Sequence, residues 1–86
     1  MDIVDSEVIE VIEFDDRVIH RVECIYDFGD EKKTVVVRLQ SDGFCLFENV
    51  LSIVEDVGYK KLNAMREFAK EYNKFFFLLY DVEKVT

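Results

Sequence analysis

The sequence predicts a small α+β fold: an antiparallel sheet of three to four strands with two helices packed on one face, in the order β-β-β-α-α-β. Residues 8–40 predict the strands, because β-branched and aromatic residues alternate there with polar ones. Residues 47–73 predict the helices, because apolar residues recur there at helical spacing. With 86 residues, half of them hydrophobic, the chain is expected to form a single domain over residues 1–86.

The first two predicted strands form a hairpin. They cover residues 8–14 and 17–28, and the pair Asp15-Asp16 suits a tight connection between them. Alternation in the second strand places one set of side chains on the buried face of the sheet: Val18, His20, Val22, Cys24, Tyr26 and Phe28. The opposite face of that strand is predicted to be mostly solvated.

Residues 7–14 have a helical alternative. Glu7, Glu10 and Glu13 are spaced by three, and on a helix they would align in one acidic stripe. We favour a strand because the neighbouring apolar residues are β-branched, and β-branched side chains are stiff and disfavour a short helix. These residues are Val8, Ile9, Val11 and Ile12.

The next elements are a third strand and the two helices. A turn at residues 29–31 leads into a strand at residues 33–40, and residues 41–43 form a second turn. The helices are predicted over residues 47–57 and 59–73, separated by Gly58 as a helix C-cap. Residues 44–47 have the alternative of extending the sheet as a short strand.

The last predicted element is a strand at residues 75–80, in which both the odd-numbered and the even-numbered positions are apolar. Such a run predicts a central strand, or a strand at a homodimer interface formed through Phe75 to Tyr80. The run is far shorter than the roughly 20 residues of a membrane helix, so no membrane association is expected. The N-terminus lacks a signal-peptide pattern, and two cysteines make no disulfide framework. A soluble cytoplasmic protein is therefore expected.

Charge is distributed unevenly along the chain. Residues 1–31 hold eleven acidic residues against two arginines, a net charge of minus nine, whereas residues 32–86 hold eight acids against nine Lys or Arg. A field of one sign attracts cationic partners and repels polyanions, so direct nucleic-acid binding is not expected. The absence of proline and the abundance of Glu, Lys and Val are typical of proteins from hot environments.

Residues that could carry chemistry are few. The single histidine, His20, lies on the predicted apolar face and is interpreted as a core residue. No nucleophile signature, EF-hand spacing or paired-cysteine motif is present, so neither a metal nor another cofactor is expected. We accordingly expect a protein that is not an enzyme.

The leading functional hypothesis is an acidic interaction protein that binds and inhibits a basic protein partner, including a partner that normally holds nucleic acid. Small viral or mobile-element antagonists have this general size and charge, which is an analogy only. The hypothesis assigns partner binding to eight carboxylates: Glu7, Glu10, Glu13, Asp15, Asp16, Asp27, Asp30 and Glu31.

Two alternatives remain open at the sequence level. One is a small-molecule-binding or catalytic domain with a pocket around His20, lined by Tyr26, Phe28, Tyr72 and Tyr80. The other is a structural subunit of a larger assembly.

Overall fold

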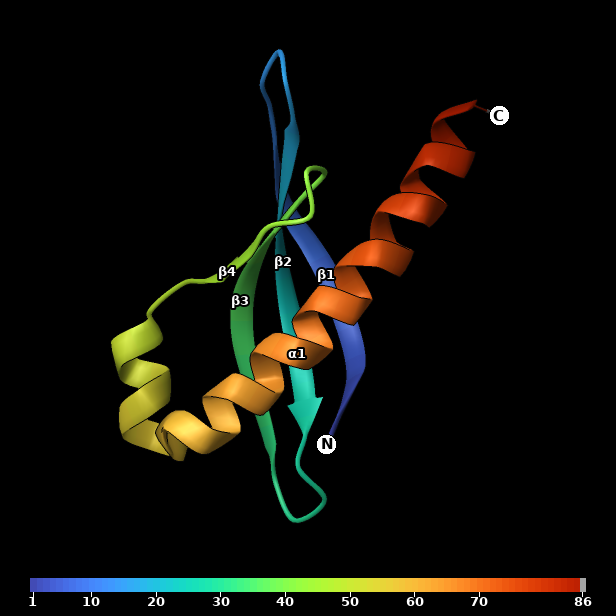
Figure 1. The fold of residues 1–86 in the computed structure, drawn as a ribbon. Helices are drawn as coiled ribbons and strands as arrows, with labels where there is room; N and C mark the ends of the chain where they lie inside the picture. Colours follow the sequence, from blue (N-terminus) through green and yellow to red (C-terminus); the bar gives the residue numbers. More distant parts are fainter. Residues whose placement is uncertain (86) are drawn as a thin grey trace.

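The computed structural model describes residues 1–85, with side chains described through residue 79. Four strands precede one long helical element (Figure 1). Their bounds are β1 (Asp2–Glu13), β2 (Val18–Asp27), β3 (Lys32–Gln40), β4 (Cys45–Phe47) and α1 (Val50–Val85). The strands form one antiparallel sheet in the order β1-β2-β3-β4, so each strand pairs with its neighbours in the chain. The predicted α+β class is confirmed.

The predicted C-terminal strand is wrong. Residues 75–80 belong to α1, and the element order is β-β-β-β-α. The buried positions Leu62, Met65, Ala69 and Phe77 recur three, four or eight residues apart, so the apolar run continues the buried stripe of the preceding helix. No glycine or proline separates the run from that helix, and nothing in the chain therefore ends it before residue 75.

The prediction of two separate helices is also corrected. The structure has one helical element, and Gly58 within it has φ 85° and ψ 166°, which are not helical angles and which produce a kink. The helix begins at Val50 rather than at residue 47, because residues 45–47 pair with β3 as the short strand β4. The alternative in which residues 44–47 extend the sheet is thus the one observed for Cys45–Phe47.

Residues 7–14 adopt the strand alternative, as part of β1 through Glu13. The pairing of β1 with β2 shifts register twice, between Ile3 and Asp5 and between Val8 and Glu10. Each shift inserts one extra residue into β1, so side chains three apart in the sequence come to the same face of the sheet. Two such bulges therefore change which acidic side chains share a face.

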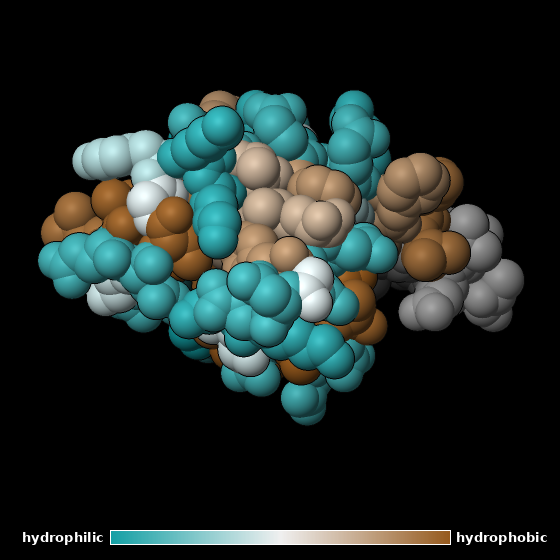
Figure 2. All heavy atoms as spheres, turned by 90° about the horizontal axis from the view of Figure 1, so that it is seen from below, coloured by the Kyte–Doolittle hydropathy of each residue, from teal (hydrophilic) through white to brown (hydrophobic). Residues whose placement is uncertain are grey.

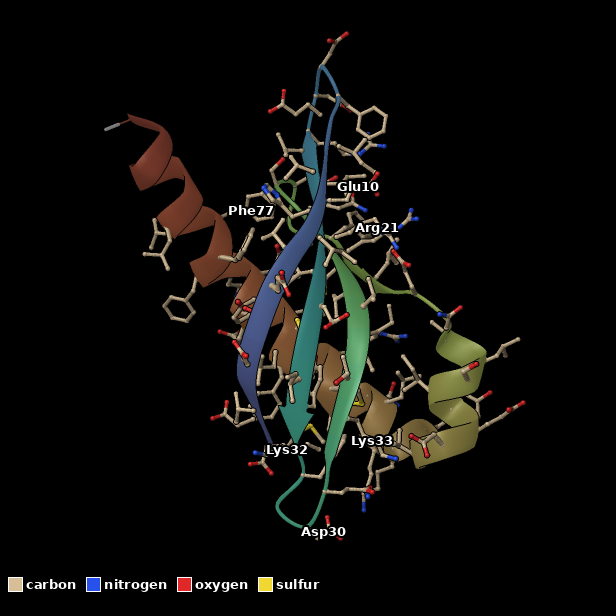
Figure 3. All side chains as sticks on the ribbon, turned by 180° about the vertical axis from the view of Figure 1, so that it is seen from behind. Glu10, Arg21, Asp30, Lys32, Lys33 and Phe77 are labelled. Atoms are coloured by element: carbon tan, nitrogen blue, oxygen red, sulfur yellow. The ribbon has the colours of Figure 1, made fainter. Side chains whose placement is uncertain are left out.

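The hydrophobic core lies between α1 and one face of the sheet. Val22, Tyr26 and Leu39 are fully buried there against residues of α1 such as Met65. The Tyr26 hydroxyl donates a hydrogen bond to the Met65 carbonyl oxygen at 2.8 Å, which ties β2 to the helix. The opposite face of the sheet carries no helix, and Figure 3 looks onto it with α1 behind the strands. We call it the open face.

In the part of the chain that the structure describes, no helix has the length and apolar character needed to cross a membrane.

Candidate functional site

Acidic side chains gather on the open face of β1 and β2. Residues that are paired across antiparallel strands project to the same side of the sheet, so the register identifies them. Odd-numbered residues of β2 face away from the core, and their partners on β1 are Asp2, Asp5, Glu7, Glu10 and Ile12. The two bulges, at Val4 and Ile9, bring four of the β1 acids to this one face.

One end of the open face is an ion-pair cluster. Arg21 on β2 is bonded to Glu48 through Nε (2.6 Å) and to Glu10 through Nη1 (3.0 Å), and Arg38 on β3 is bonded to Glu48 at 3.1 Å. These bonds hold the pKa of the Glu48 carboxyl near 2 and raise the pKa of Arg21. Figure 3 shows Glu10 and Arg21 side by side. The four charges neutralise one another, so this end of the face is not available as an acidic site.

The remaining acids of the face have no such partner. We call them the acidic open face, and they are Asp2, Asp5, Glu7, Glu23 and Asp27. None of the five forms an ion pair with another residue in the described part of the chain.

Within the acidic open face, like charges are directly opposed. Glu7 lies opposite Glu23, and Asp2 lies opposite Asp27, in the register of β1 with β2. Opposed residues of an antiparallel pair have Cβ atoms about 5 Å apart, and like charges in that position are destabilising. On the other side of Glu23, the opposed residue of β3 is the uncharged Val36. Asp27, by contrast, has the cationic Lys32 opposite it on β3, so the like-charge pair without an opposed cation is Glu7 with Glu23.

The eight carboxylates predicted to bind a partner fall into three groups. Glu7, Glu10 and Asp27 are on the open face; Glu13, Asp15 and Asp16 are at the β1–β2 end; and Asp30 and Glu31 are in the β2–β3 turn. The two ends are separated by the ten residues of β2, or about 30 Å at the rise of a strand. Figure 3 shows Glu10 and Asp30 well apart along the sheet. The eight residues thus do not form one compact surface.

Several of the eight are paired within the chain. Asp16 is bonded to Arg17 at 3.2 Å, and Glu31 is 3.7 Å from Lys33. Together with Glu10, these acids carry less free charge than the sequence alone indicates.

Sequence reasoning missed three members of the acidic open face. Asp2 and Asp5 precede the segment that was predicted as a strand, and Glu23 was placed on the mostly solvated face of the second strand but not among the partner-binding residues. The sequence feature that could have placed Glu23 on the open face is its odd-numbered position in β2. For Asp2 and Asp5 the face depends on the bulge at Val4, for which the sequence carries no glycine or other marker.

The region around His20 is packed rather than open. His20 is 2% exposed, and its ring lies edge-on to Phe76 and Phe77 at centroid distances of 5.0 and 5.2 Å. Tyr26 is fully buried, and Tyr72 is hydrogen-bonded to Ser6 through its hydroxyl. The side chain of Tyr80 lies outside the described residues. This packing gives no support to a ligand pocket centred on His20.

Over the described residues, no three His, Cys, Asp or Glu side chains are grouped as ligands of a metal ion. Comparison of the chain with protein-family models, with curated proteins and with solved structures yields no match.

Proposed function

We propose that this chain is a non-enzymatic interaction protein whose acidic open face binds a basic site on a protein partner and inhibits that partner. The observation that carries the proposal is the opposed pair Glu7 and Glu23, on a face that no other element covers. A cationic side chain placed between these two carboxylates would relieve their repulsion on binding. The free energy stored as repulsion thereby becomes part of the binding free energy.

A purely protective role does not account for this face. Acids on an edge strand prevent it from pairing with other chains, and that role suits β1. Glu23 and Asp27, however, lie on β2, which is paired on both sides and has no edge to protect. The acids of β2 thus favour binding over edge protection.

The spacing of the carboxylates suits a groove lined with several cations. Neighbouring acids lie about 5 Å apart across the strands and about 7 Å apart along them. A basic groove that normally holds the phosphates of a nucleic acid presents a row of Lys and Arg side chains. Such a groove is the partner site that we propose.

The test is a pull-down from host lysate with tagged protein, eluted in steps of rising salt and analysed by mass spectrometry. The open-face variant carries Asp5→Asn, Glu7→Gln, Glu23→Gln and Asp27→Asn. A charge-matched variant carries Asp15→Asn, Asp16→Asn, Asp30→Asn and Glu31→Gln. Each removes four negative charges, but only the first does so on the open face.

We expect the unaltered chain and the charge-matched variant to capture the same basic protein, released at moderate salt, and the open-face variant to lose it. Equal capture by both variants would show that net charge rather than this face is responsible. A stoichiometric partner that salt does not release would instead favour a structural subunit. Added to an activity assay of the captured protein, the unaltered chain should inhibit it.

We further propose that two copies of the chain associate through α1. Phe68, Phe75 and Leu79 are 38%, 64% and 65% exposed, and their spacing of seven and four residues places them on one stripe. Figure 2 shows hydrophobic side chains gathered next to the grey end of the chain. Exposed apolar stripes of this kind favour a symmetric helix pair. The stripe extends the residues 75–80 from which the sequence suggests a homodimer.

Sedimentation velocity tests this association. The unaltered chain should sediment as a dimer, and Phe75→Glu with Leu79→Glu should convert it to a monomer. Lys74→Ala, a change at an exposed neighbouring position, should leave the dimer intact. A monomer at every concentration of the unaltered chain would refute the proposal.

A further inference from the structure

The outer edge of β1 carries no partner strand. β1 is the first strand of the sheet, and in the described part of the chain it pairs only with β2. The Phe14 N–H donates to the Arg17 carbonyl oxygen at 2.8 Å, and the ladder that follows bonds the odd-numbered residues of β2 to β1. Their partners on β1 direct their backbone groups toward β2, and the residues between those partners direct theirs outward. In the middle of β1 the outward-pointing residues are Ser6, Val8 and Val11.

Two aspartates close part of this edge. Asp5 Oδ1 accepts a hydrogen bond from the outward-pointing N–H of Ser6 at 2.8 Å, and Asp2 Oδ1 accepts one from the N–H of Ile3 at 2.9 Å. The carboxylate of Asp5 thus occupies the position that the carbonyl oxygen of an added strand would take. A neutral strand would have to displace this negative charge without replacing its bond. A strand with a cation opposite Asp5 replaces the bond with an ion pair.

The two faces of the sheet differ beside this edge. On the open face, Asp5 and Glu7 form no ion pair in the described part of the chain. On the face that α1 covers, Val8 and Val11 are still 41% and 47% exposed. Figures 1 and 3 show the C-terminal part of α1 continuing past β1. The helix therefore extends beyond the last strand of the sheet on this side.

We propose that an extended segment of the basic partner adds to the outer edge of β1 as a fifth strand. The inference rests on the proposed function and names the form that one segment of the partner takes. Residues 5–8 pair with β2 without a shift in register, so they give the added segment a regular edge to follow. Its backbone would bond to the outward-pointing groups of Ser6 and Val8, as an extended peptide does when it joins an exposed strand.

The side chains of β1 specify those of the segment. Opposed side chains of neighbouring strands lie about 5 Å apart, and opposite charges in that position are stabilising. Cations therefore belong opposite Asp5 and Glu7, where they would also relieve the repulsion between Glu7 and Glu23. Side chains alternate between the two faces of a strand, so the residues opposite Ser6 and Val8 lie on the α1 side and should be apolar. The segment should alternate basic and apolar residues.

A second copy of the chain fits this edge less well than a basic segment does. Antiparallel pairing of two β1 edges would place the open-face acids of both copies side by side, and like charges in that position are destabilising. The same acids that exclude another β1 attract a basic strand, which is how one surface rejects one partner and selects another. The edge is therefore assigned to the basic partner.

The probe for the test is a fluorescein-labelled heptapeptide of alternating Lys and Val, measured by fluorescence anisotropy with the full chain. A peptide of alternating Gln and Val should bind about tenfold or more weakly, because it has no cation for Asp5 and Glu7. Equal binding of the two peptides would overturn the assignment to a basic segment.

Two further peptides carry backbone N-methyl groups either on the lysines or on the valines. Because only one set of N–H groups faces β1, one methylated peptide should bind about tenfold or more weakly and the other within about twofold of the parent. Loss on valine methylation indicates an antiparallel strand, and loss on lysine methylation a parallel one.

Two variants of the chain test the same edge from the other side. Val8→Pro removes an outward N–H at a position where an edge strand tolerates proline, and Val8→Ile keeps that N–H. Val8→Pro should weaken peptide binding by about tenfold or more, and Val8→Ile should leave it within about twofold. The methylated peptides, used with the unaltered chain, keep the test decisive if Val8→Pro does not fold.

Failure of this inference is distinguishable from failure of the proposed function. Equal binding of both methylated peptides, with loss of binding in the open-face variant, would overturn strand addition and leave the acidic open face as the binding site. Absence of peptide binding to the unaltered chain would also overturn strand addition, while the pull-down still tests the proposed function. Self-association that is lost in Val8→Pro but kept in Val8→Ile would assign the edge to a second copy instead.

Discussion

Glu23 is the residue on which the functional account depends most. It lies on a strand that is paired on both sides, opposite Glu7 on one neighbour and Val36 on the other. Because no cation of the described residues neutralises it, its charge costs the fold free energy. Arg21, two residues earlier on the same face, is by contrast saturated by Glu10 and Glu48.

A double-mutant cycle measures this repulsion. Glu7→Gln should raise the free energy of unfolding by about 0.5 kcal/mol, because cross-strand pairs contribute roughly 0.2–1 kcal/mol. In a Glu23→Gln background the same change should have almost no effect. Urea unfolding at low ionic strength gives the four values, and high salt should reduce the coupling. If Glu7→Gln destabilises both backgrounds equally, the two carboxylates do not repel one another.

The pKa of His20 is predicted to lie below its ordinary value. Burial between Phe76 and Phe77 lowers its pKa from 6.5, and the charge of Glu13 opposes this shift only in part. A histidine with a lowered folded-state pKa binds its proton more readily when unfolded. Its contribution to stability is therefore complete above pH 6.5 and is lost as the pH falls from 6.5 toward the folded-state value.

An NMR titration of the imidazole signals checks this directly. We expect a midpoint below 6.5, and thermal unfolding should show a melting temperature that falls as the pH drops below 6.5. Replacement of His20 by Phe should flatten that part of the pH dependence. A midpoint at or above 6.5 would contradict the buried, neutral imidazole.

At the scale of elements, α1 shows what the sequence could and could not predict. Its segment from Tyr59 to Asn73 was predicted as a helix from one clear apolar stripe, and the buried positions Leu62, Met65 and Ala69 confirm it. Residues 75–80 are apolar at every position, so periodicity cannot distinguish a buried strand from a helix there. Their continuity with the preceding helix decides the outcome, because forming a new element would require a break that the sequence lacks.

Gly58 is predicted to be required for the kink in α1. Its φ of 85° and ψ of 166° lie in a region that is open essentially only to glycine. A Cβ built at this position meets no other atom within 4 Å, so the penalty of a side chain comes from the backbone alone. Gly58→Ala should lower the free energy of unfolding by about 1–3 kcal/mol.

Chemical denaturation of Gly58→Ala measures this penalty, and Asn63→Ala is the matched control. Asn63 is exposed in the same element, and alanine is the stronger helix former, so that change should be neutral or slightly stabilising. Equal stability of the two variants would mean that residues 50–85 form an unkinked helix. The C-cap prediction for Gly58 identified the position of the break and the helix that follows it, but not that the two helical segments form one kinked element.

β1 shows a second limit of sequence reasoning. Its β-branched residues favoured a strand, which the structure confirms, but the bulges at Val4 and Ile9 have no marker in the sequence. A single inserted residue transfers every following side chain to the other face. The acids that share the open face could therefore not be deduced from a regular alternation.

At the scale of the whole molecule, the uneven distribution of charge along the sequence corresponds to a division between the elements of the fold. The acidic first 31 residues become β1, β2 and their turns, whereas α1 covers the opposite face of the sheet. The sequence predicted the acidic half and its preference for a cationic partner. It could not show that Arg21 neutralises Glu10 and Glu48, because those pairs join segments whose register is fixed only in the fold.

The most direct test of the acidic open face is carboxyl footprinting of the chain, free and bound to the basic protein captured in the pull-down. A carbodiimide couples an amine to accessible carboxylates, and mass spectrometry reports the labelling of each residue. We predict that the partner protects Glu7, Glu23 and Asp27, while Asp15 and Asp30 are labelled equally in both states. Protection of the turn residues with unchanged labelling of Glu7 and Glu23 would contradict the account.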